Sequence, residues 1–254
     1  MPMNREESAS ERIARDEPKR FAHDSKGASA TPFTFIYLAS QSPRRRQLLD
    51  QIGVRHQLLL AGPDEDVEAL EAERAGESPL HYVERVTRAK LAAARARRIA
   101  RDLPAAPILC ADTTVALRRR IFGKPRDAAD AAATLRLLAG RTHRVITAVA
   151  VGEGADEAFA ISASSVRFAP IDDLEIERYV ASGEPFGKAG AYAIQSGAAV
   201  WIERVSGCYS GIMGLPLYET ARLLRQAGVG FQGTPRTPEP PHRCMPGRGN
   251  DRSM

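Results

Sequence analysis

Apolar residues in this chain follow two patterns, which are short unbroken runs and runs spaced three or four residues apart. The unbroken runs predict buried strands at residues 34–39 and 108–112 and a further strand at residues 56–61. Helical spacing predicts one helix over residues 42–53, which ends at a glycine, and a longer one over residues 80–103, which ends before a proline. The first half of the chain therefore alternates strands with helices.

The second half of the chain adds a predicted hairpin. Apolar and polar residues alternate at 143–151 and 157–169, on either side of the turn GEGADE, which is typical of two antiparallel strands. Similar patterns predict three more helices, at residues 127–138, 171–182 and 216–226, and one more strand at residues 198–205. Because the hairpin interrupts the alternation of strands and helices, we expect an α/β fold with a mixed, twisted sheet and flanking helices.

The two ends of the chain have a different composition. Residues 1–32 mix charged residues with Ser and Ala and carry few large apolar side chains, so burial cannot offset the entropy of ordering them. Residues 233–254 are rich in Pro and Arg. We expect a disordered extension, a folded body over residues 33–232 and a disordered tail.

Charge and cysteine content narrow the class of protein. The chain of 254 residues has 36 Lys and Arg against 31 Asp and Glu, and the resulting charge of +5 suits a polyanionic ligand without demanding nucleic acid. Cys110, Cys208 and Cys244 are too few and too widely spaced for a disulfide framework or a zinc site. No run is long enough to cross a membrane and no signal segment is evident. These features fit a cytoplasmic protein.

The sequence SPRR, residues 42–45, lies between a predicted strand and a predicted helix. Free N–H groups at a helix N-terminus attract anions, and Arg44 and Arg45 add two guanidiniums that can hold a phosphate chain. The alternative is a solvated basic first turn. That alternative leaves two cations at the unfavourable end of the helix dipole, and a bound anion removes this objection.

Two acidic residues could bind a metal ion or accept a proton during catalysis. Asp112 is predicted at the exit of a strand, beside Thr113, where a carboxylate can hold a divalent cation or take a proton from water. Glu65 lies in an acidic loop after the second strand and could supply another oxygen ligand for the metal. The alternatives are a capping or turn role for Asp112 and a solvated acidic cluster around Glu65.

Basic residues beyond the SPRR sequence fit an anion site. Lys90 lies on the long helix, Lys124 lies in the turn GKP, and Lys188 lies in the glycine-rich segment GKAG. The turn GKP is not a P-loop, because the required glycine spacing and the following Ser or Thr are absent. His143 opens a strand and is expected to be structural, since no nucleophile pairs with it recognisably.

Six ordered motifs resemble one family. They are LASQSPRRRQLL, CADTTV, FGKP, GRTHRVITAV, GEPFGKAGAYAIQ and GCYSGIMGLPLYET, and the similarity covers about residues 36–229. In this order they resemble the Maf family of nucleoside triphosphate pyrophosphatases. The resemblance implies an α/β fold with two lobes around a deep cleft, similar to inosine triphosphate pyrophosphatases. It also implies metal-dependent hydrolysis (Mg²⁺ or Mn²⁺) between the α- and β-phosphates, and it implies that a homodimer is possible.

The resemblance also assigns roles to residues. It implies that Asp112 is the proton acceptor, and it associates Arg44, Thr113 and Gln195 with the choice of substrate. It identifies the following acidic and basic residues as lining the cleft: Glu65, Arg45, Lys90, Lys124 and Lys188.

The motifs also bear on the substrate. The ADT and IQ motifs resemble the branch acting on dTTP and UTP. The amide of Gln195 can pair with the edge of uracil or thymine, although it could also flip to suit cytosine, so modified pyrimidine nucleotides stay open. Ser196 departs from the glycine usual after this glutamine, and glycine is often selected for a backbone conformation that other residues adopt at a cost.

Two other functions fit part of the sequence. A non-catalytic role in cell division, linked to septum formation, would need an interaction surface, for which the Pro- and Arg-rich tail is the only candidate. A nucleic-acid-binding protein would explain the basic charge, and it would show steep salt dependence without turnover. Release of pyrophosphate from a nucleotide separates the enzyme from both alternatives.

Overall fold

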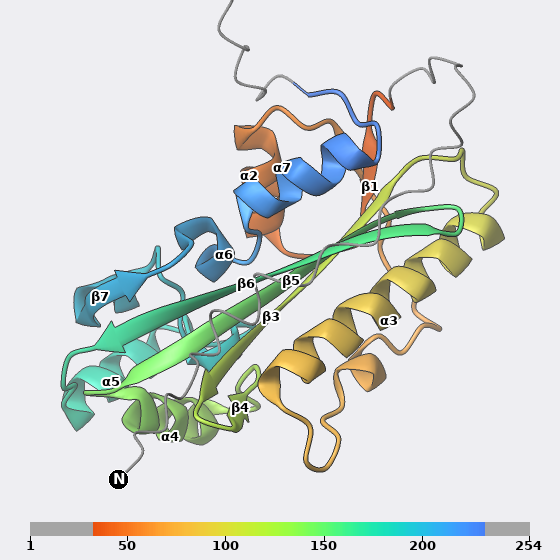
Figure 1. Cartoon of the computed structure of the whole chain (residues 1–254). Helices are drawn as coiled ribbons and strands as arrows, with labels where there is room; N and C mark the ends of the chain where they lie inside the picture. Colours follow the sequence, from red (N-terminus) through yellow and green to blue (C-terminus); the bar gives the residue numbers. More distant parts are fainter. Residues whose placement is uncertain (1–32, 232–254) are drawn as a thin grey trace, which may run out of the picture.

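A mixed sheet of seven strands forms the centre of the computed structural model, which describes residues 33–231 (Figure 1). The predictions for residues 1–32 and 233–254 lie outside this part of the chain. The strands run in the order β2-β1-β3-β5-β6-β7, and β4 pairs with β3. Their bounds are β1 (Ile36–Leu38), β2 (His56–Leu58), β3 (Ile108–Leu117), β4 (Arg120–Phe122), β5 (Thr142–Glu153), β6 (Asp156–Phe168) and β7 (Ile202–Ser206).

The sheet combines both kinds of strand pairing. Strand β1 runs parallel to β2 and β3, whereas β3 runs antiparallel to β4 and β5. The strands β5 and β6 form the predicted hairpin, and β7 continues it in the antiparallel sense. The prediction of a mixed sheet with flanking helices is therefore confirmed.

Six α-helices and three short 3₁₀ helices surround the sheet in the described part of the chain. The α-helices are α2 (Pro43–Gln51), α3 (Pro79–Ala100), α4 (Ala128–Leu138), α5 (Asp173–Ala181), α6 (Tyr209–Met213) and α7 (Leu217–Gln226). The 3₁₀ helices are η1 (Glu68–Glu71), η2 (Ala189–Ala191) and η3 (Gly197–Trp201). Among residues 33–231, no helix is long and apolar enough to cross a membrane.

Alternating side chains along the central strands fill hydrophobic cores on both faces of the sheet. On β5, Val149 and Val151 pack with α2 and α7, whereas Ala148 and Ala150 belong to the cores beneath α3. Successive side chains of a strand point to opposite faces, so α3 covers one face of the sheet and α2 and α7 cover the other (Figure 1). This arrangement forms the first lobe.

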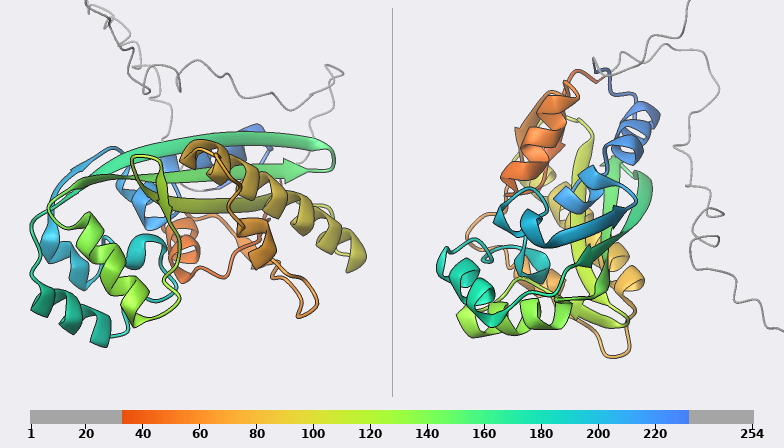
Figure 2. Two further views of the ribbon diagram at one scale, coloured as in Figure 1. Left: turned by 90° about the horizontal axis from the view of Figure 1, so that it is seen from below. Right: turned by 90° about the vertical axis from the view of Figure 1, so that its left-hand side faces the viewer.

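A further core forms the second lobe. The helices α4 and α5 pack against the far ends of β5 and β6, as Figure 2 shows, and Phe168, Tyr179, Tyr192 and Trp201 meet edge to face between them. The start of α5 is fixed by a capping box, in which Asp172 accepts from the backbone N–H of the first helical turn. The two lobes share the long strands β3, β5 and β6.

The structure corrects the predicted position of Asp112. This residue does not end a strand but lies in the middle of β3, opposite Ala148 on β5. The pairing continues to Ala116, because the residues that follow Asp112 are mostly β-branched and β5 is long enough to pair with them. The carboxylate is therefore fixed by a rigid strand.

Three other segments differ from prediction. The patterns described above predict no strand at residues 120–122, where the short strand β4 pairs with the extended part of β3. Helix η3 replaces the first half of the strand predicted at residues 198–205, since its small residues have no partner strand before Ile202 pairs with β6. The patterns likewise predict no helix at residues 209–213, where α6 forms.

Candidate active site

A cleft with a volume of about 1050 Å³ lies between the two lobes. Its walls come from the β1–α2 turn, the segment after β2 with η1, helix α3, strand β3, the turn after β4, the segment around η2, and the α6–α7 turn. The structure brings every site residue predicted from the sequence to this one cleft: Arg44, Arg45, Glu65, Lys90, Asp112, Thr113, Lys124, Lys188 and Gln195.

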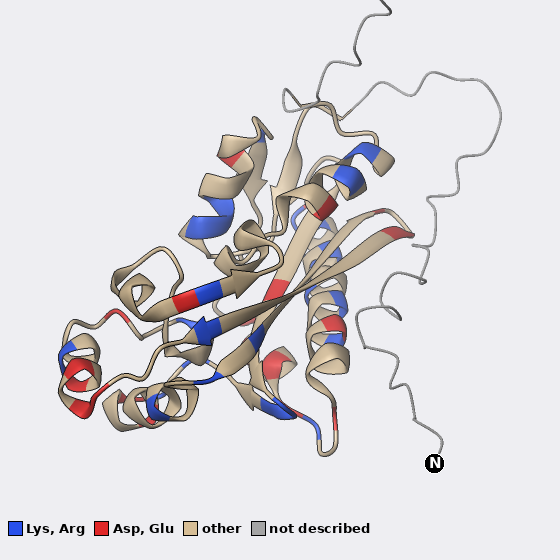
Figure 3. Ribbon diagram, turned by 60° about the vertical axis from the view of Figure 1, so that its left-hand side comes forward, with Lys and Arg blue, Asp and Glu red and all other residues tan. Residues whose placement is uncertain are grey.

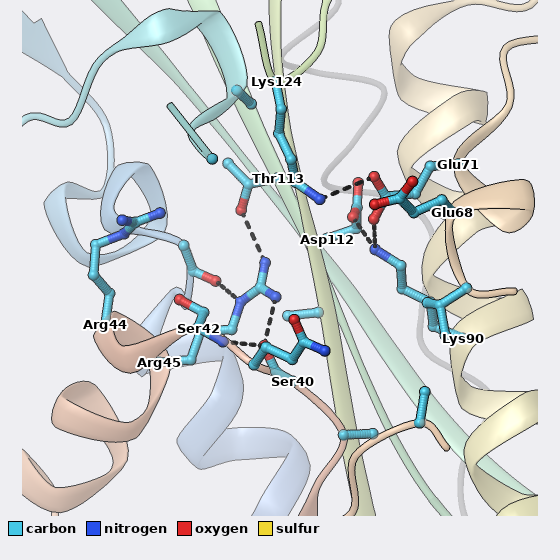
Figure 4. Close-up of a pocket in the computed structure, with 18 of the residues that line it drawn as sticks. Ser40, Ser42, Arg44, Arg45, Glu68, Glu71, Lys90, Asp112, Thr113 and Lys124 are labelled. Carbon is cyan, nitrogen blue, oxygen red and sulfur yellow. Dashed lines mark hydrogen bonds and ion pairs between the residues drawn. The ribbon is translucent and has the colours of Figure 1, made fainter. Parts of the chain in front are cut away.

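Asp112 lies at one end of a chain of ion pairs, which Figure 4 shows. Lys90 Nζ, from α3, donates to Asp112 Oδ1 at 2.6 Å and to Glu71 Oε1 at 2.7 Å. Lys124 Nζ donates to the other oxygen of Glu71 at 3.2 Å. Two carboxylates and two ammonium groups therefore form one network between α3, β3, η1 and the turn after β4.

The network keeps Lys90 and Glu71 charged. Burial by itself would lower the pKa of Lys90, but the carboxylates of Asp112 and Glu71 raise that pKa above its ordinary value. Burial would likewise raise the pKa of Glu71, yet Lys90 and Lys124 hold it below the ordinary value. Glu71 and Lys90 thus carry opposite charges at neutral pH.

Glu65 lines the cleft and is engaged by α3. Arg97 Nε lies 2.8 and 3.0 Å from its two carboxylate oxygens, and Arg97 Nη2 lies 2.6 Å from Oε2. The backbone N–H of Gly62 donates to the same carboxylate at 3.0 Å. The hydrogen bond from Arg97 and then that from Gly62 lower the pKa of Glu65 to about 2.

Arg45 is held by the protein itself. Its Nε donates to the carbonyl of Gly214 at 2.8 Å, Nη1 to Ser40 Oγ at 3.0 Å, and Nη2 to Thr113 Oγ1 at 3.4 Å. Burial lowers the pKa of this guanidinium below its ordinary value. Thr113 also lies 2.9 Å from the hydroxyl of Thr147, so Arg45 and Thr113 belong to one hydrogen-bonded wall of the cleft.

Arg44 lies on a different side of the cleft from Arg45 (Figure 4), so the two guanidiniums do not point at one spot. Within the described residues its only hydrogen bond runs from Nε to the carbonyl of Met213, at 3.3 Å, and no carboxylate pairs with it. Burial lowers the pKa of Lys188, and the charge of Arg44 lowers it further. These two cations repel each other, and an anion between them would relieve the repulsion.

The β1–α2 turn differs slightly from expectation. Ser42 takes the N-cap position of α2, but its side chain makes no capping hydrogen bond. Its backbone N–H donates to Ser40 Oγ at 3.2 Å. The first N–H groups of α2 are therefore not capped by Ser42, which suits the predicted role of this turn in anion binding.

The opposite end of the cleft is apolar. Gln195 lies beside a group of lining residues that belong to, or pack against, the core of the second lobe: Val115, Val145, Tyr192, Ile194, Ile212 and Met213. The hydroxyl of Tyr192 lies 2.7 Å from Nε2 of the buried His143. Burial lowers the pKa of His143 to about 4, so this buried histidine is neutral near pH 7.

Ser196 fits its position without strain. Its φ of −121° lies in the extended region, which does not require glycine. Its hydroxyl donates to the carbonyl of Ala193 at 3.1 Å. The backbone next to Gln195 is therefore undisturbed by the serine.

Sequence reasoning missed Glu71 and the apolar end. Glu71 lies 19 residues before Lys90 and 53 before Lys124, so no local spacing links them. Tyr192 and Ile194 lie in a glycine-rich segment whose pattern predicts neither a strand nor a helix. Neither Glu71 nor the apolar end can be recognised from local sequence patterns, because the residues involved come together only in the folded structure.

The described residues contain no group of three or more His, Cys, Asp or Glu that could hold a metal ion by themselves. The acidic oxygens in the cleft are nevertheless of the hard type that Mg²⁺ and Mn²⁺ prefer. A metal here would therefore rely on one or two protein carboxylates together with oxygens of a bound ligand, as is common for Mg²⁺ with phosphates.

The fold and the cleft define a two-lobed α/β protein with a binding site for a small anionic ligand, polar at one end and apolar at the other. The profile of the Maf-like protein family matches residues 35–227, nearly all of the described part of the chain. The chain belongs to this family.

Curated relatives match over most of their length. A dTTP/UTP pyrophosphatase of Burkholderia pseudomallei (strain 1710b) is 62% identical over 205 residues, which are 80% of this chain and 98% of the relative. A protein of the same name from Polaromonas sp. (strain JS666 / ATCC BAA-500) is 62% identical over 195 residues, or 77% and 96%. Another from Cupriavidus metallidurans is 62% identical over 198 residues, or 78% and 99%.

Proposed function

We propose that this protein is a nucleoside triphosphate pyrophosphatase, which hydrolyses the anhydride between the α- and β-phosphates and releases a monophosphate and pyrophosphate. The observation that carries the proposal is the position of Asp112, a carboxylate among cations in a cleft of about 1050 Å³. That volume accommodates a nucleotide. The names of relatives that are 62% identical support dTTP and UTP as the main substrates, with modified pyrimidine nucleotides as further candidates.

The two ends of the cleft define the orientation of the substrate. The base lies at the apolar end, against Tyr192 and beside Gln195, whose amide offers a donor and an acceptor to a pyrimidine edge. The phosphates extend toward Lys90 and Lys124. Arg44, which no carboxylate neutralises within residues 33–231, is available to the base or to a phosphate.

The reaction follows from this orientation. Asp112 accepts a proton from a water molecule as the water oxygen attacks the α-phosphorus; the bond from this phosphorus to the bridging oxygen breaks, and pyrophosphate leaves with that oxygen. Lys90 and Lys124 stabilise the negative charge that develops on the phosphate oxygens. The rigid strand β3 and the ion pair with Lys90 hold the Asp112 carboxylate in place.

A divalent cation fits this site. Asp112 and Glu65 are the proposed protein ligands, because both line the cleft with hard carboxylate oxygens. Within residues 33–231 the Asp112 side chain accepts one hydrogen bond and keeps lone pairs for a metal, whereas Glu65 already accepts four and would exchange some of them for the metal. When bound, Mg²⁺ or Mn²⁺ would neutralise charge on the substrate phosphates. The protein residues orient the substrate and hold the proton acceptor.

Three further proposed properties of this protein are its compartment, its oligomeric state and its lack of a nucleic-acid partner. We propose that the protein acts in the cytoplasm, where nucleoside triphosphates are found, and that it forms a homodimer, since Val200 and Tyr218 are large apolar side chains that are 82% and 77% exposed. Helix α3 carries mostly basic residues (Figure 3), but most of them are already paired with carboxylates, which does not favour a nucleic-acid partner; the paired ones are Arg85, Arg88, Lys90, Arg95 and Arg97. Light scattering of the purified protein tests the dimer.

Pyrophosphate release tests the activity. The purified protein is incubated with dTTP, UTP, CTP and GTP, with Mg²⁺, with Mn²⁺ and with a chelator, and both products are measured. We expect a monophosphate and pyrophosphate in equal amounts, fastest from dTTP and UTP and only with metal. Release of single phosphate ions, or no turnover of any nucleotide, would contradict the proposal and return attention to a binding or regulatory role.

A further inference from the structure

Glu71 joins the two walls of the cleft. Its carboxylate accepts from Lys90 on α3 at 2.7 Å and, through the other oxygen, from Lys124 after β4 at 3.2 Å. Both lysines lie at the end of the cleft where the proposed function needs phosphate-binding cations. Glu71 therefore occupies ammonium donors that a bound phosphate would use.

The backbone around Glu71 is fixed. Three backbone carbonyls here accept hydrogen bonds from side chains on α3. Arg85 donates to the carbonyl of Leu70 at 3.2 Å and to that of Ala72 at 2.9 Å. The hydroxyl of Tyr82 donates to the carbonyl of Glu71 at 2.8 Å. Arg85 is in turn held by both carboxylate oxygens of Glu77, at 2.7 and 2.8 Å. The fold thus presents Glu71 from a fixed backbone, and only its side chain needs to move.

The contacts of Glu71 differ in strength. Lys90 is 13% exposed and is also held by Asp112, whereas Lys124 is 53% exposed and more distant from Glu71. An exposed pair of this kind contributes little to stability, because water screens it. A phosphate group carries more charge than a carboxylate and has more acceptor oxygens, so it competes well for both lysines.

We propose that Glu71 acts as a displaceable internal anion. In the empty cleft it neutralises Lys90 and Lys124, and a phosphate of the ligand takes its place on these lysines. Glu71 thereby sets the affinity of the cleft for phosphates and weakens the binding of ligands with too little charge to displace it. This inference rests on the proposed function, because that function assigns the two lysines to phosphate.

Binding of inorganic pyrophosphate tests the inference directly. The affinity of the full chain for this probe is measured by calorimetry without metal, for the wild type, Glu71→Gln and Glu68→Gln. Glu68 is a matched control, since it lies on the same 3₁₀ helix and lines the same cleft, yet its side chain has no hydrogen bond or ion pair within residues 33–231. The comparison separates a direct contact from the general loss of one negative charge.

We expect Glu71→Gln to bind pyrophosphate about tenfold more tightly, as removal of one competing charge-assisted hydrogen bond implies, and Glu68→Gln to stay within about twofold of the wild type. Glu71→Asp provides a second variant, because its shorter side chain cannot span both lysines. It should also bind more tightly. Thermal unfolding checks that each variant is folded.

Equal or weaker binding by Glu71→Gln would overturn the inference, since it would make Glu71 neutral or helpful to phosphate binding. An equal gain in Glu68→Gln would also overturn it, by reducing the effect to overall charge. Tight binding of pyrophosphate by the wild type, with no change in the variants, leaves the proposed function standing. Failure of every variant to bind pyrophosphate contradicts both.

Discussion

Arg97 holds Glu65 through both carboxylate oxygens and also donates from Nη1 to the carbonyl of Leu59 at 2.8 Å. One buried guanidinium therefore fastens the acidic segment after β2 to helix α3. Because that segment forms a wall of the cleft, the pair supports the shape of the site as well as the stability of the fold.

The pair makes stability depend on pH in a defined range. The pKa of Glu65 is lowered from 4.5 to about 2, so its contribution to the free energy of unfolding is complete above about pH 4.5 and is lost as the pH falls toward 2. Glu65→Gln should lower the free energy of unfolding by about 2 kcal/mol at pH 7 and by much less near pH 2.

Urea unfolding at pH 7 and at pH 2.5 measures this difference. Glu84→Gln is the control, because Glu84 pairs with Arg88 on the exposed face of α3 and should cost less than about 0.5 kcal/mol. A cost for Glu65→Gln that is the same at both pH values would show that the ion pair is not its source.

The role of Asp112 is tested by Asp112→Asn. The amide keeps the shape of the side chain but cannot accept a proton, so the turnover number should fall by roughly 10²- to 10⁴-fold. Pyrophosphate release from dTTP measures it, and Asp64→Asn, in the same cleft, is the control that should keep near-normal turnover. Near-normal turnover in Asp112→Asn would remove Asp112 from the proposed chemistry.

Reading of the base is tested by Gln195→Ala. Loss of the amide leaves a polar group of the base unpaired. It should lower kcat/KM for dTTP and UTP by a factor that corresponds to about 1–3 kcal/mol of transition-state stabilisation, with a smaller decrease for CTP and GTP. Arg44→Ala is measured on the same nucleotides. A uniform loss for Arg44→Ala would assign that residue to phosphate, and a uniform loss for Gln195→Ala would show that Gln195 does not read the base.

His143 gives a second pH dependence. Burial lowers its pKa from 6.5 to about 4, so the unfolded chain binds the proton more readily and stability falls as the pH drops from about 6.5 to 4. His143 should account for about 3 kcal/mol of that loss. His143→Gln should flatten the slope of the melting temperature against pH over this range, whereas His81→Gln, on the surface of α3, should leave it unchanged.

Much of the fold follows from local patterns in the sequence. The hairpin β5–β6 and the long helix α3 are marked by clear alternation and by helical spacing with a terminal proline, and both form close to their predicted bounds. The end of β3 was not predictable, because Thr113 and Thr114 suit a strand equally well whether or not a partner strand exists. That partner, β5, begins 30 residues after Asp112 in the sequence, and it pairs with β3 from Asp112 through Ala116.

The candidate site is predictable to a similar degree. Its ordered motifs identify residues that do meet in one cleft, such as Arg44, Asp112 and Gln195. The partners of these residues were not predictable, because they depend on long-range packing. Arg97 is one of many arginines on α3, and nothing in its spacing distinguishes it as the partner of Glu65.

The contact between Arg45 and the carbonyl of Gly214 joins positions 169 residues apart in the sequence. Phe33 likewise pairs with Val229, so the first described residue lies beside the segment that follows α7. During translation the chain must therefore emerge past Gly214 before this wall of the cleft can close. A chain that ends before Gly214 would therefore lack the contact that closes this wall of the cleft.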